Sequence, residues 1–166
     1  MSKTYEVERK FLLKRIPDLK YEKIIHIKQY YLESKSGSSD RIRRSEGKNG
    51  VKYYRTIKNR KSERASEEIE NEITKKEFYD LKKRSHSNIS KYRHIIKEGE
   101  YKWEIDKFDN IELVMAEIEM ISNDDHLTDV VNKINSLSLP QFIIDNFIME
   151  VSDFRPFSNK RLAIPN

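Results

Sequence analysis

The sequence contains no cysteine, which excludes disulfide bonds and thiolate metal sites. Histidine is almost as scarce, and its four residues, none paired at metal-ligand spacing, are His26, His86, His94 and His126. Any bound metal would therefore depend mainly on carboxylate ligands. Oxygen ligands suit hard cations such as Mg²⁺, Mn²⁺ or Ca²⁺.

Long apolar runs are also missing, and none approaches the ~20 residues that cross a bilayer. The first residues lack the apolar stretch of a signal peptide, so we expect a cytoplasmic protein without a membrane partner. Only four glycines and four prolines occur among 166 residues, and no long flexible stretch is present. These features predict one domain that spans residues 1–166.

Charge, in contrast, is abundant: 37% of the residues are charged, although the net charge is only +5. Residues 1–64 hold 19 Lys and Arg against 8 Asp and Glu, whereas residues 65–166 hold 14 against 20. This asymmetry is compatible with two surface regions of opposite sign, or with bases and acids that meet around one site. A basic half also fits nucleic-acid binding.

Alternation with a period of two predicts about eight strands. They cover residues 5–13, 25–32, 41–43, 51–58, 68–73, 90–96, 101–108 and 113–121. Turn sequences at 36–39, 47–50 and 98–100 separate several of them. Helical spacing predicts helices at 75–84 and 126–137 and short ones at 16–23 and 141–147. Eight antiparallel strands indicate a barrel or a sandwich, and such a barrel can hold one small ligand.

Side chains of one sign recur in pairs on single strand faces. Two such residues lie about 7 Å apart at their Cα atoms, and like charges that close oppose each other's ionisation without a counter-ion. Alternating charge usually marks the solvated face of a sheet. Its repetition nevertheless favours a charged lumen that binds ions, with the two longer helices covering the apolar outer faces. The pairs are Glu6 with Glu8, Arg41 with Arg43, Glu68 with Glu70 and Glu72, Lys91 with Arg93, Glu104 with Asp106, and Glu117 with Glu119.

Nine segments in order resemble the motifs of the CYTH family, also called the triphosphate tunnel metalloenzymes. They start with Glu6-Val7-Glu8-Arg9-Lys10-Phe11-Leu12, Lys28-Gln29-Tyr30-Tyr31-Leu32, Arg41-Ile42-Arg43 and Thr56-Ile57-Lys58. They continue with Glu68-Ile69-Glu70-Asn71-Glu72-Ile73, Lys91-Tyr92-Arg93, Trp103-Glu104-Ile105-Asp106-Lys107-Phe108 and Met115-Ala116-Glu117-Ile118-Glu119-Met120. The last comprises Glu150-Val151-Ser152 and Ser158-Asn159-Lys160-Arg161-Leu162-Ala163.

Three positions depart from the family pattern. Tyr30 stands where the family usually has glycine, in what reads as a turn, and Phe157 where it often has tyrosine. Ser66 stands where the family usually has an arginine, just before the motif that begins at Glu68, and Arg64 is nearby. Because of this departure, the alignment of the residues around Glu68 with the family motif stays undetermined by two positions.

The resemblance implies a mainly β (α+β) fold, a closed eight-stranded antiparallel tunnel with a few helices packed outside. It implies hydrolysis of a linear triphosphate with Mg²⁺ or Mn²⁺ as cofactor. The implied metal ligands are Glu6, Glu8, Glu68, Glu70, Asp106, Glu117 and Glu119. The implied phosphate-binding residues are Lys10, Arg41, Arg43, Lys58, Lys91 and Arg93. The catalytic set comprises Glu6, Glu8, Lys10 and Lys58.

Several substrates stay open within this resemblance. The short chain and its first motif look most like bacterial inorganic triphosphatases, so tripolyphosphate is the expected substrate. The alternatives are a class IV-type adenylate cyclase, a thiamine triphosphatase, action on RNA 5′-triphosphate, or non-catalytic binding of polyphosphate or nucleic acid. The carboxylates argue against a pure anion binder, because acids in the site would only repel its ligand. Family members can dimerise, which makes a homodimer compatible with the resemblance.

Overall fold

The computed structural model describes residues 3–62, 64–152 and 157–166, and eight of its strands form a closed antiparallel barrel. The barrel strands are β1 (Thr4–Leu13), β2 (Lys23–Leu32), β3 (Ser38–Gly47), β4 (Gly50–Arg60), β5 (Ala65–Glu72), β6 (Ser87–Glu98), β7 (Tyr101–Phe108) and β8 (Val114–Asn123). Two short strands, β9 (Phe147–Glu150) and β10 (Ile164–Pro165), pair with β1 and β6. The expected barrel is thereby confirmed, and each of the eight predicted strands is present.

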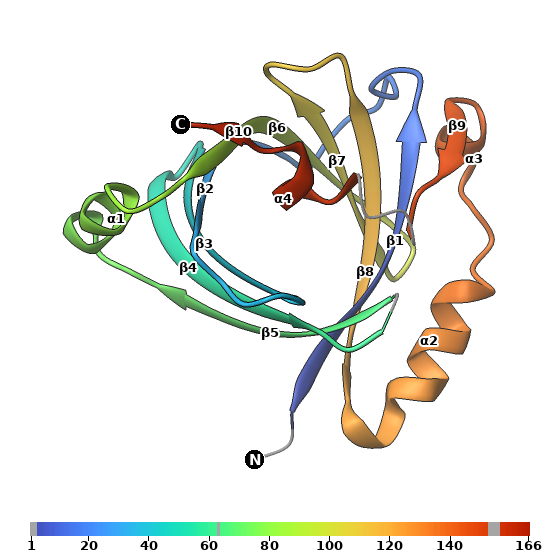
Figure 1. Cartoon of the computed structure of the whole chain (residues 1–166). Coiled ribbons are helices and arrows are strands. Elements are labelled where there is room, and N and C mark those ends of the chain that lie inside the picture. Colours follow the sequence, from blue (N-terminus) through green and yellow to red (C-terminus); the bar gives the residue numbers. More distant parts are fainter. Residues whose placement is uncertain (1–2, 63, 153–156) are drawn as a thin grey trace.

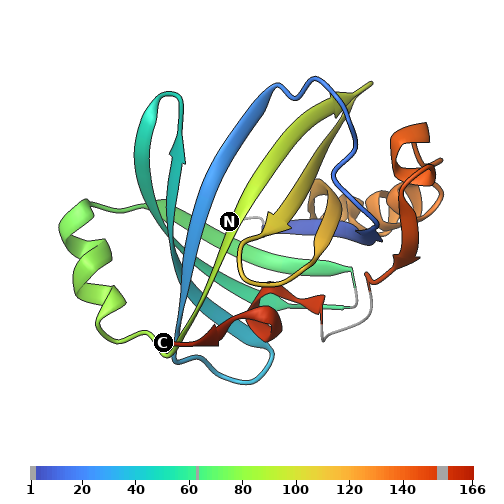
Figure 2. The ribbon, with the colours of Figure 1, turned by 90° about the horizontal axis from the view of Figure 1, so that it is seen from above.

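Pairing around the barrel runs β6-β2-β3-β4-β5-β1-β8-β7, and β7 returns to β6 to close it (Figures 1 and 2). The seam between β1 and β5 is short, with Tyr5, Val7 and the residue between them in register. Beyond it, the amide of Lys10 donates to Ser152 Oγ at 3.0 Å, and that of Val151 to the Lys10 carbonyl at 2.8 Å. The chain after β9 therefore continues the wall where β5 leaves β1.

The helices of the described residues lie against the outside of the barrel or at its mouth (Figure 1). They are α1 (Lys75–Lys82), the 3₁₀ turn η1 (Asp124–His126), α2 (Leu127–Asn135), α3 (Gln141–Ile144) and α4 (Asn159–Leu162). A capping box between Thr74 and Glu77 starts α1. The helices expected near 75–84 and 126–137 are confirmed as outer coverings of the barrel.

The main apolar core lies outside the lumen, between the barrel wall and α2 with α3. Outward-facing side chains of β1, β7 and β8, among them Val7, Phe11 and Trp103, pack there against Ile134 and Ile143. All five are at most 1% exposed. Burial of each such side chain contributes roughly 1.5–3 kcal/mol to the stability of the fold. Because this outer core supplies the apolar burial, the inner faces of the strands can carry charged side chains.

A second outer cluster forms beneath α1, where Phe78 is 1% exposed and packs with Ile42 of β3. Tyr30 belongs to this cluster, with its ring edge-on to Phe78 at a centroid distance of 5.9 Å. The position lies inside β2 rather than in a turn. The strand predicted over 25–32 is thereby confirmed, the tyrosine alters no turn, and its ring fills space between the sheet and α1.

An apolar layer also lies at one end of the lumen. Leu12, Tyr31, Ile89, Phe108 and Met115 are buried in one cluster, and they come from β1, β2, β6, β7 and β8. The C-terminal segment packs on this cluster through Phe157, Leu162 and Ala163. The lumen is thus charged along its length but apolar where the C-terminal segment meets it.

Two of the short helix predictions need correction. Residues 16–22 form no helix, and β2 begins at residue 23, because Ile16 precedes Pro17 and a pre-proline residue is biased toward extended backbone. The helix predicted at 141–147 ends at Ile144, and Phe147 starts β9. The sequence patterns also missed β9, α4 and β10, which are too short to show a period.

Candidate active site in the barrel lumen

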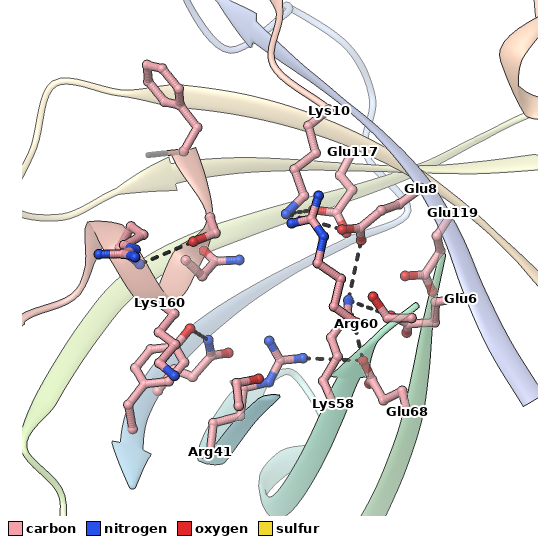
Figure 3. A pocket seen from close by; sticks show the side chains of 18 of the residues that line it. Glu6, Glu8, Lys10, Arg41, Lys58, Arg60, Glu68, Glu117, Glu119 and Lys160 are labelled. Atoms are coloured by element: carbon pink, nitrogen blue, oxygen red, sulfur yellow. Dashed lines mark hydrogen bonds and ion pairs between the residues drawn. The ribbon is translucent and has the colours of Figure 1, made fainter. Parts of the chain in front are cut away.

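The lumen forms a cavity of about 670 Å³ whose walls are charged side chains (Figure 3). All six expected phosphate-binding residues line it: Lys10, Arg41, Arg43, Lys58, Lys91 and Arg93. Six of the seven expected metal ligands line it as well: Glu6, Glu8, Glu68, Glu70, Glu117 and Glu119. Asp106, the seventh, lies buried beneath the cavity surface and is 4% exposed.

Strand register explains why these groups meet. Across β1 and β8, Glu8 lies opposite Glu119 and Lys10 opposite Glu117. Lys58 of β4 pairs in register with Glu68 of β5. Facing residues of adjacent strands point to the same side of a sheet, so each pairing delivers both side chains to the lumen. The register around Glu68 is therefore the one that the sequence motif implied.

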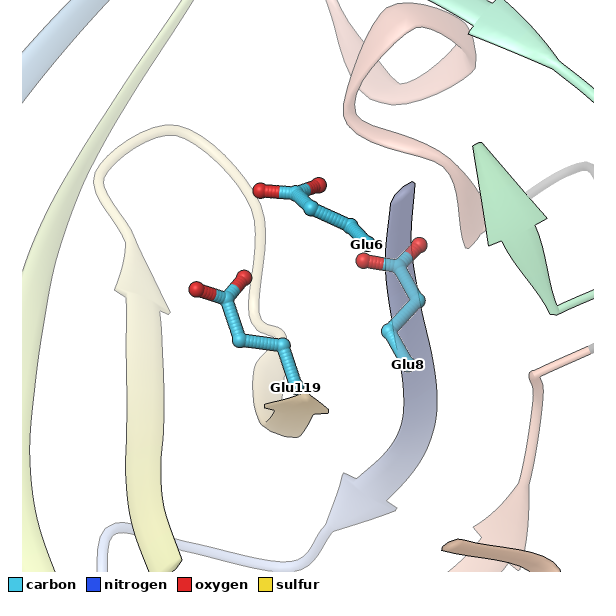
Figure 4. Close-up of side chains that lie close together, drawn as sticks. All are labelled: Glu6, Glu8 and Glu119. Carbon is cyan, nitrogen blue, oxygen red and sulfur yellow. The ribbon is translucent and has the colours of Figure 1, made fainter. Parts of the chain in front are cut away.

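Three carboxylates from two strands converge at one point of the wall. Oxygen atoms of Glu6, Glu8 and Glu119 lie within 4.8 Å of one another (Figure 4). Burial, followed by repulsion from Glu104 and Glu6, raises the pKa of Glu119 to about 7. Such mutual repulsion falls when a cation lies between the oxygens, so this donor set fits a divalent metal with oxygen ligands.

A second acidic group adjoins the first and shares Glu119. It contains Glu104 and Glu117, whose carboxylate oxygens also lie within 4.8 Å of each other and of Glu119. Burial and then Glu8 raise the pKa of Glu117 well above its usual value. Glu104 was absent from the expected ligands, although its alternation with Asp106 placed it on the same strand face.

Two lysines separate these acids from the basic wall. Lys58 Nζ lies 2.9 Å from Glu6, 3.6 Å from Glu8 and 3.7 Å from Glu68. Lys10 Nζ lies 3.4 Å from Glu8 and 3.7 Å from Glu117. Burial lowers the pKa of each lysine, but the surrounding carboxylates outweigh it and raise the pKa overall. Both ammonium groups therefore stay charged at neutral pH.

Buried atoms without hydrogen-bond partners mark the basic wall. Among the described side chains, Arg41 Nε, Arg43 Nε and Glu68 Oε2 are buried and make no hydrogen bond. Glu68 Oε2 has only longer ion-pair contacts, 3.8 Å to Arg41 and 3.7 Å to Lys58. Buried polar groups in folded proteins are nearly always satisfied. Two unsatisfied guanidinium donors that line the cavity are therefore consistent with an anionic ligand.

The remaining expected residues are engaged with one another. Arg93 donates to both oxygens of Asp106 at 2.8 and 2.9 Å, and Lys91 Nζ lies 2.6 Å from the same carboxylate. Burial lowers the pKa of Lys91 to about 8. Glu70 pairs with Arg43 at 3.0 Å and accepts from Thr56. Asp106 and Glu70 thus neutralise bases, and neither belongs to a carboxylate cluster of the described residues.

The C-terminal segment adds lining residues that belong to the ninth motif but were given no role in the sequence analysis. Asn159 Oδ1 accepts from Lys91 Nζ at 3.0 Å, and Lys160 Nζ donates to Ser34 Oγ and the Ser38 carbonyl. These contacts attach α4 to the tunnel (Figure 3). Arg60 and Lys102 also line the cavity from β4 and β7. Their alternation with Lys58 and Glu104 was the available signal.

The fold and the lumen together define a β-tunnel protein with carboxylates gathered beside a basic wall. Comparisons with family models and with curated protein sequences find no match. Solved structures do match. The inorganic triphosphatase NE1496 is 27% identical, with a TM-score of 0.61 and 97% of each chain covered.

Two more distant structures share the fold. The PH1819 protein from Pyrococcus horikoshii is 20% identical, with a TM-score of 0.61 over 78% of this chain and 86% of that one. A putative adenylate cyclase from Bacillus halodurans is 18% identical, with a TM-score of 0.55 over 92% and 97%. The ordered motifs, the closed barrel and the likeness to NE1496 together support a member of the CYTH family of triphosphate tunnel metalloenzymes. In the part of the chain that the structure describes, no helix is long and apolar enough to cross a membrane.

Proposed function

We propose that the protein hydrolyses a linear triphosphate, with inorganic tripolyphosphate as the substrate, to pyrophosphate and phosphate. The observation that carries this proposal is the lumen itself, where two clusters of carboxylates adjoin a wall of arginine and lysine. A triphosphate carries about four negative charges, and its transfer from water into a cavity requires compensating cations. The likeness to an inorganic triphosphatase supports the same substrate class.

The basic wall would bind the phosphate chain. Arg41 and Arg43 each have a buried Nε donor that lacks a partner, and a hydrogen bond from Nε to a phosphate oxygen would replace no existing one. The Nη2 atom of Arg43 is already bonded to Glu70. Lys10 and Lys58 lie between this wall and the acids. Their ammonium groups would neutralise charge on the transferred and leaving oxygens as the anhydride bond lengthens.

The acidic clusters would hold one or two Mg²⁺ or Mn²⁺ ions through Glu6, Glu8 and Glu119, and through Glu104 with Glu117. When bound, such a cation draws charge from phosphate oxygens and helps to orient the substrate. A lumen carboxylate would orient the attacking water and accept its proton. The water oxygen bonds to the terminal phosphorus, the P–O bond of the anhydride breaks, and pyrophosphate leaves.

The test is to supply tripolyphosphate and ATP in parallel, each with Mg²⁺, Mn²⁺ or EDTA. We expect metal-dependent release of phosphate and pyrophosphate from tripolyphosphate, with little action on ATP. Formation of cyclic AMP from ATP would show that the protein is an adenylate cyclase instead. If no triphosphate turns over, thiamine triphosphate included, the hydrolase proposal is refuted. Salt-sensitive, metal-independent binding of RNA would then favour a nucleic-acid binder.

A further inference from the structure

A second cavity lies on the outer surface of the barrel, where α1 covers β2 and β3, and its volume is about 350 Å³. Its walls include Lys28 and Tyr30 of β2, Arg44 of β3, and Tyr79 and Lys82 of α1. The size falls within the range of small-molecule sites. Lys28 and Tyr30 belong to the second family motif, but none of the lumen contacts described above involves this cavity.

Basic groups outnumber acids in this cavity. Among the described residues, three cations, Lys28, Arg44 and Lys82, line it together with one carboxylate. That carboxylate belongs to Glu46 and lies 2.6 Å from Arg44 Nη1. Lys82 Nζ has no carboxylate partner among the described residues and lies over the Tyr30 ring, 4.7 Å from its centroid. The ammonium group is therefore held in place by aromatic surface while it keeps its charge unmatched.

The other polar residues around the cavity do not neutralise this excess of positive charge. His26 also lines the cavity, but its Nε2 faces Ser90 and Asp109 at 3.0 and 2.9 Å, and its ring stacks on Tyr92. Asp109 is thereby bound by His26 and Ser90, and the charge of Lys28 contributes to lowering the pKa of Asp109. This carboxylate is thus already shared with two other groups.

The cavity walls are firmly positioned. Phe78 at its base is 1% exposed and anchors α1 to the sheet, with ring contacts to Tyr53 and Tyr79 at 4.9 and 5.3 Å. Arg44 offers a planar donor pair and the two lysines offer point charges, the combination suited to phosphate oxygens.

We propose that this outer cavity binds the phosphate group of a small anion. The site does not depend on the reaction in the tunnel. Lys28 and Arg44 alternate with Gln29 and Arg43, which line the lumen, so the two cavities lie on opposite faces of the same two strands. The ligand is either an inorganic phosphate species or the phosphate of a nucleotide, whose base would contact Tyr79 at the rim.

The test is a titration of ¹⁵N-labelled protein with inorganic pyrophosphate in one arm and AMP in the other. Backbone amides of residues 78–82 report on the outer cavity, because α1 contributes no lining to the tunnel. We expect saturable shifts at these amides. Shifts with pyrophosphate alone identify an inorganic ligand, and AMP shifts that include the Tyr79 ring protons identify a nucleotide.

Matched variants separate a built site from diffuse attraction. The double variant Lys28→Gln/Lys82→Gln should bind at least tenfold more weakly, whereas Lys75→Gln, an exposed lysine of α1 outside the cavity, should bind as the wild type does. Glu46→Gln, which removes the one carboxylate among the described lining residues, should bind more tightly. Turnover of tripolyphosphate should be unchanged in all three.

Two results would overturn the proposal. One is the absence of saturable shifts in residues 78–82 with either ligand. The other is an equal loss of affinity in the Lys75→Gln and Lys28→Gln/Lys82→Gln proteins, which would mean that general surface charge attracts the anion. If the double variant does not fold, the Glu46→Gln protein still tests the proposal. Unchanged or weaker binding of the anion by that folded variant would contradict an anion site in the outer cavity.

Discussion

Glu6 and Glu8 occupy alternate positions of β1, so both carboxylates face the lumen and meet Glu119 from β8. We expect Glu6→Gln or Glu8→Gln to lower metal-dependent turnover by about a hundredfold or more, since an amide keeps the shape but removes the charge that holds a cation. Initial rates with tripolyphosphate at several Mg²⁺ concentrations measure this effect.

The control for these variants is Glu112→Gln, because the Glu112 side chain is 99% exposed and pairs only with Lys107 on the outer surface. It should retain wild-type turnover. A wild-type rate in either the Glu6→Gln or the Glu8→Gln variant would contradict the assignment of that glutamate as a metal ligand.

Arg41 contributes a buried guanidinium group whose Nε has no hydrogen-bond partner. We expect Arg41→Ala to raise KM for tripolyphosphate about ten- to a hundredfold, since a hydrogen bond to a charged group contributes about 1.5–3 kcal/mol. Steady-state kinetics measure this change. Arg55→Ala is the matched control. Arg55 is an arginine of β4 that faces the outside of the barrel and pairs with Asp40, so its loss should leave KM unchanged. An unchanged KM in the Arg41 variant would place its side chain outside the substrate site.

At the scale of elements, one ion pair links β1, β9 and α2. Arg9, only 9% exposed, donates to both oxygens of Glu150 at 2.9 and 3.0 Å and to the Ile134 carbonyl at 3.1 Å. We expect Glu150→Gln to reduce the free energy of unfolding by about 1–3 kcal/mol at pH 7, because the buried guanidinium group loses its counter-charge. Chemical denaturation followed by circular dichroism measures this.

The same pair predicts a pH dependence. Hydrogen bonds from Arg9 are the main cause that lowers the pKa of Glu150 from 4.5 to about 2. A lowered folded-state pKa adds stability above the unfolded value, and this stability is lost as pH falls through the folded value. The stability difference between wild type and Glu150→Gln should therefore be full above about pH 4.5 and shrink toward pH 2. A difference that stays constant over this range would contradict the assignment.

Over the whole molecule, seven glutamates among the described residues line the lumen, and the pKa values of Glu117 and Glu119 among them are raised. Ions that bind only the folded state stabilise it by mass action. We therefore expect Mg²⁺ and tripolyphosphate together to raise Tm by more than the sum of their separate effects, because each neutralises the other's charge in the lumen. Thermal unfolding with a Glu119→Gln control measures this, and strictly additive shifts would argue for two separate sites.

The sequence predicted the strands and the residues that share each face, because a period of two is a local property. It also predicted the helices over 75–84 and 126–137, whose apolar spacing reflects burial on one side. Short elements were harder. In β9 and α4, four residues each, no period can develop, and their conformation depends on pairing with β1 and contacts to Lys91.

By itself, the sequence determined that charges of one sign alternate along strands and that nine family motifs follow in order. Only the tertiary structure decided which of those charges meet. Pairing of β7 with β8 brings Glu104 beside Glu117 and Glu119, whereas pairing of β6 with β7 places Asp106 against Lys91 and Arg93. The physical reason is that register between strands, rather than spacing within one strand, fixes distances between side chains.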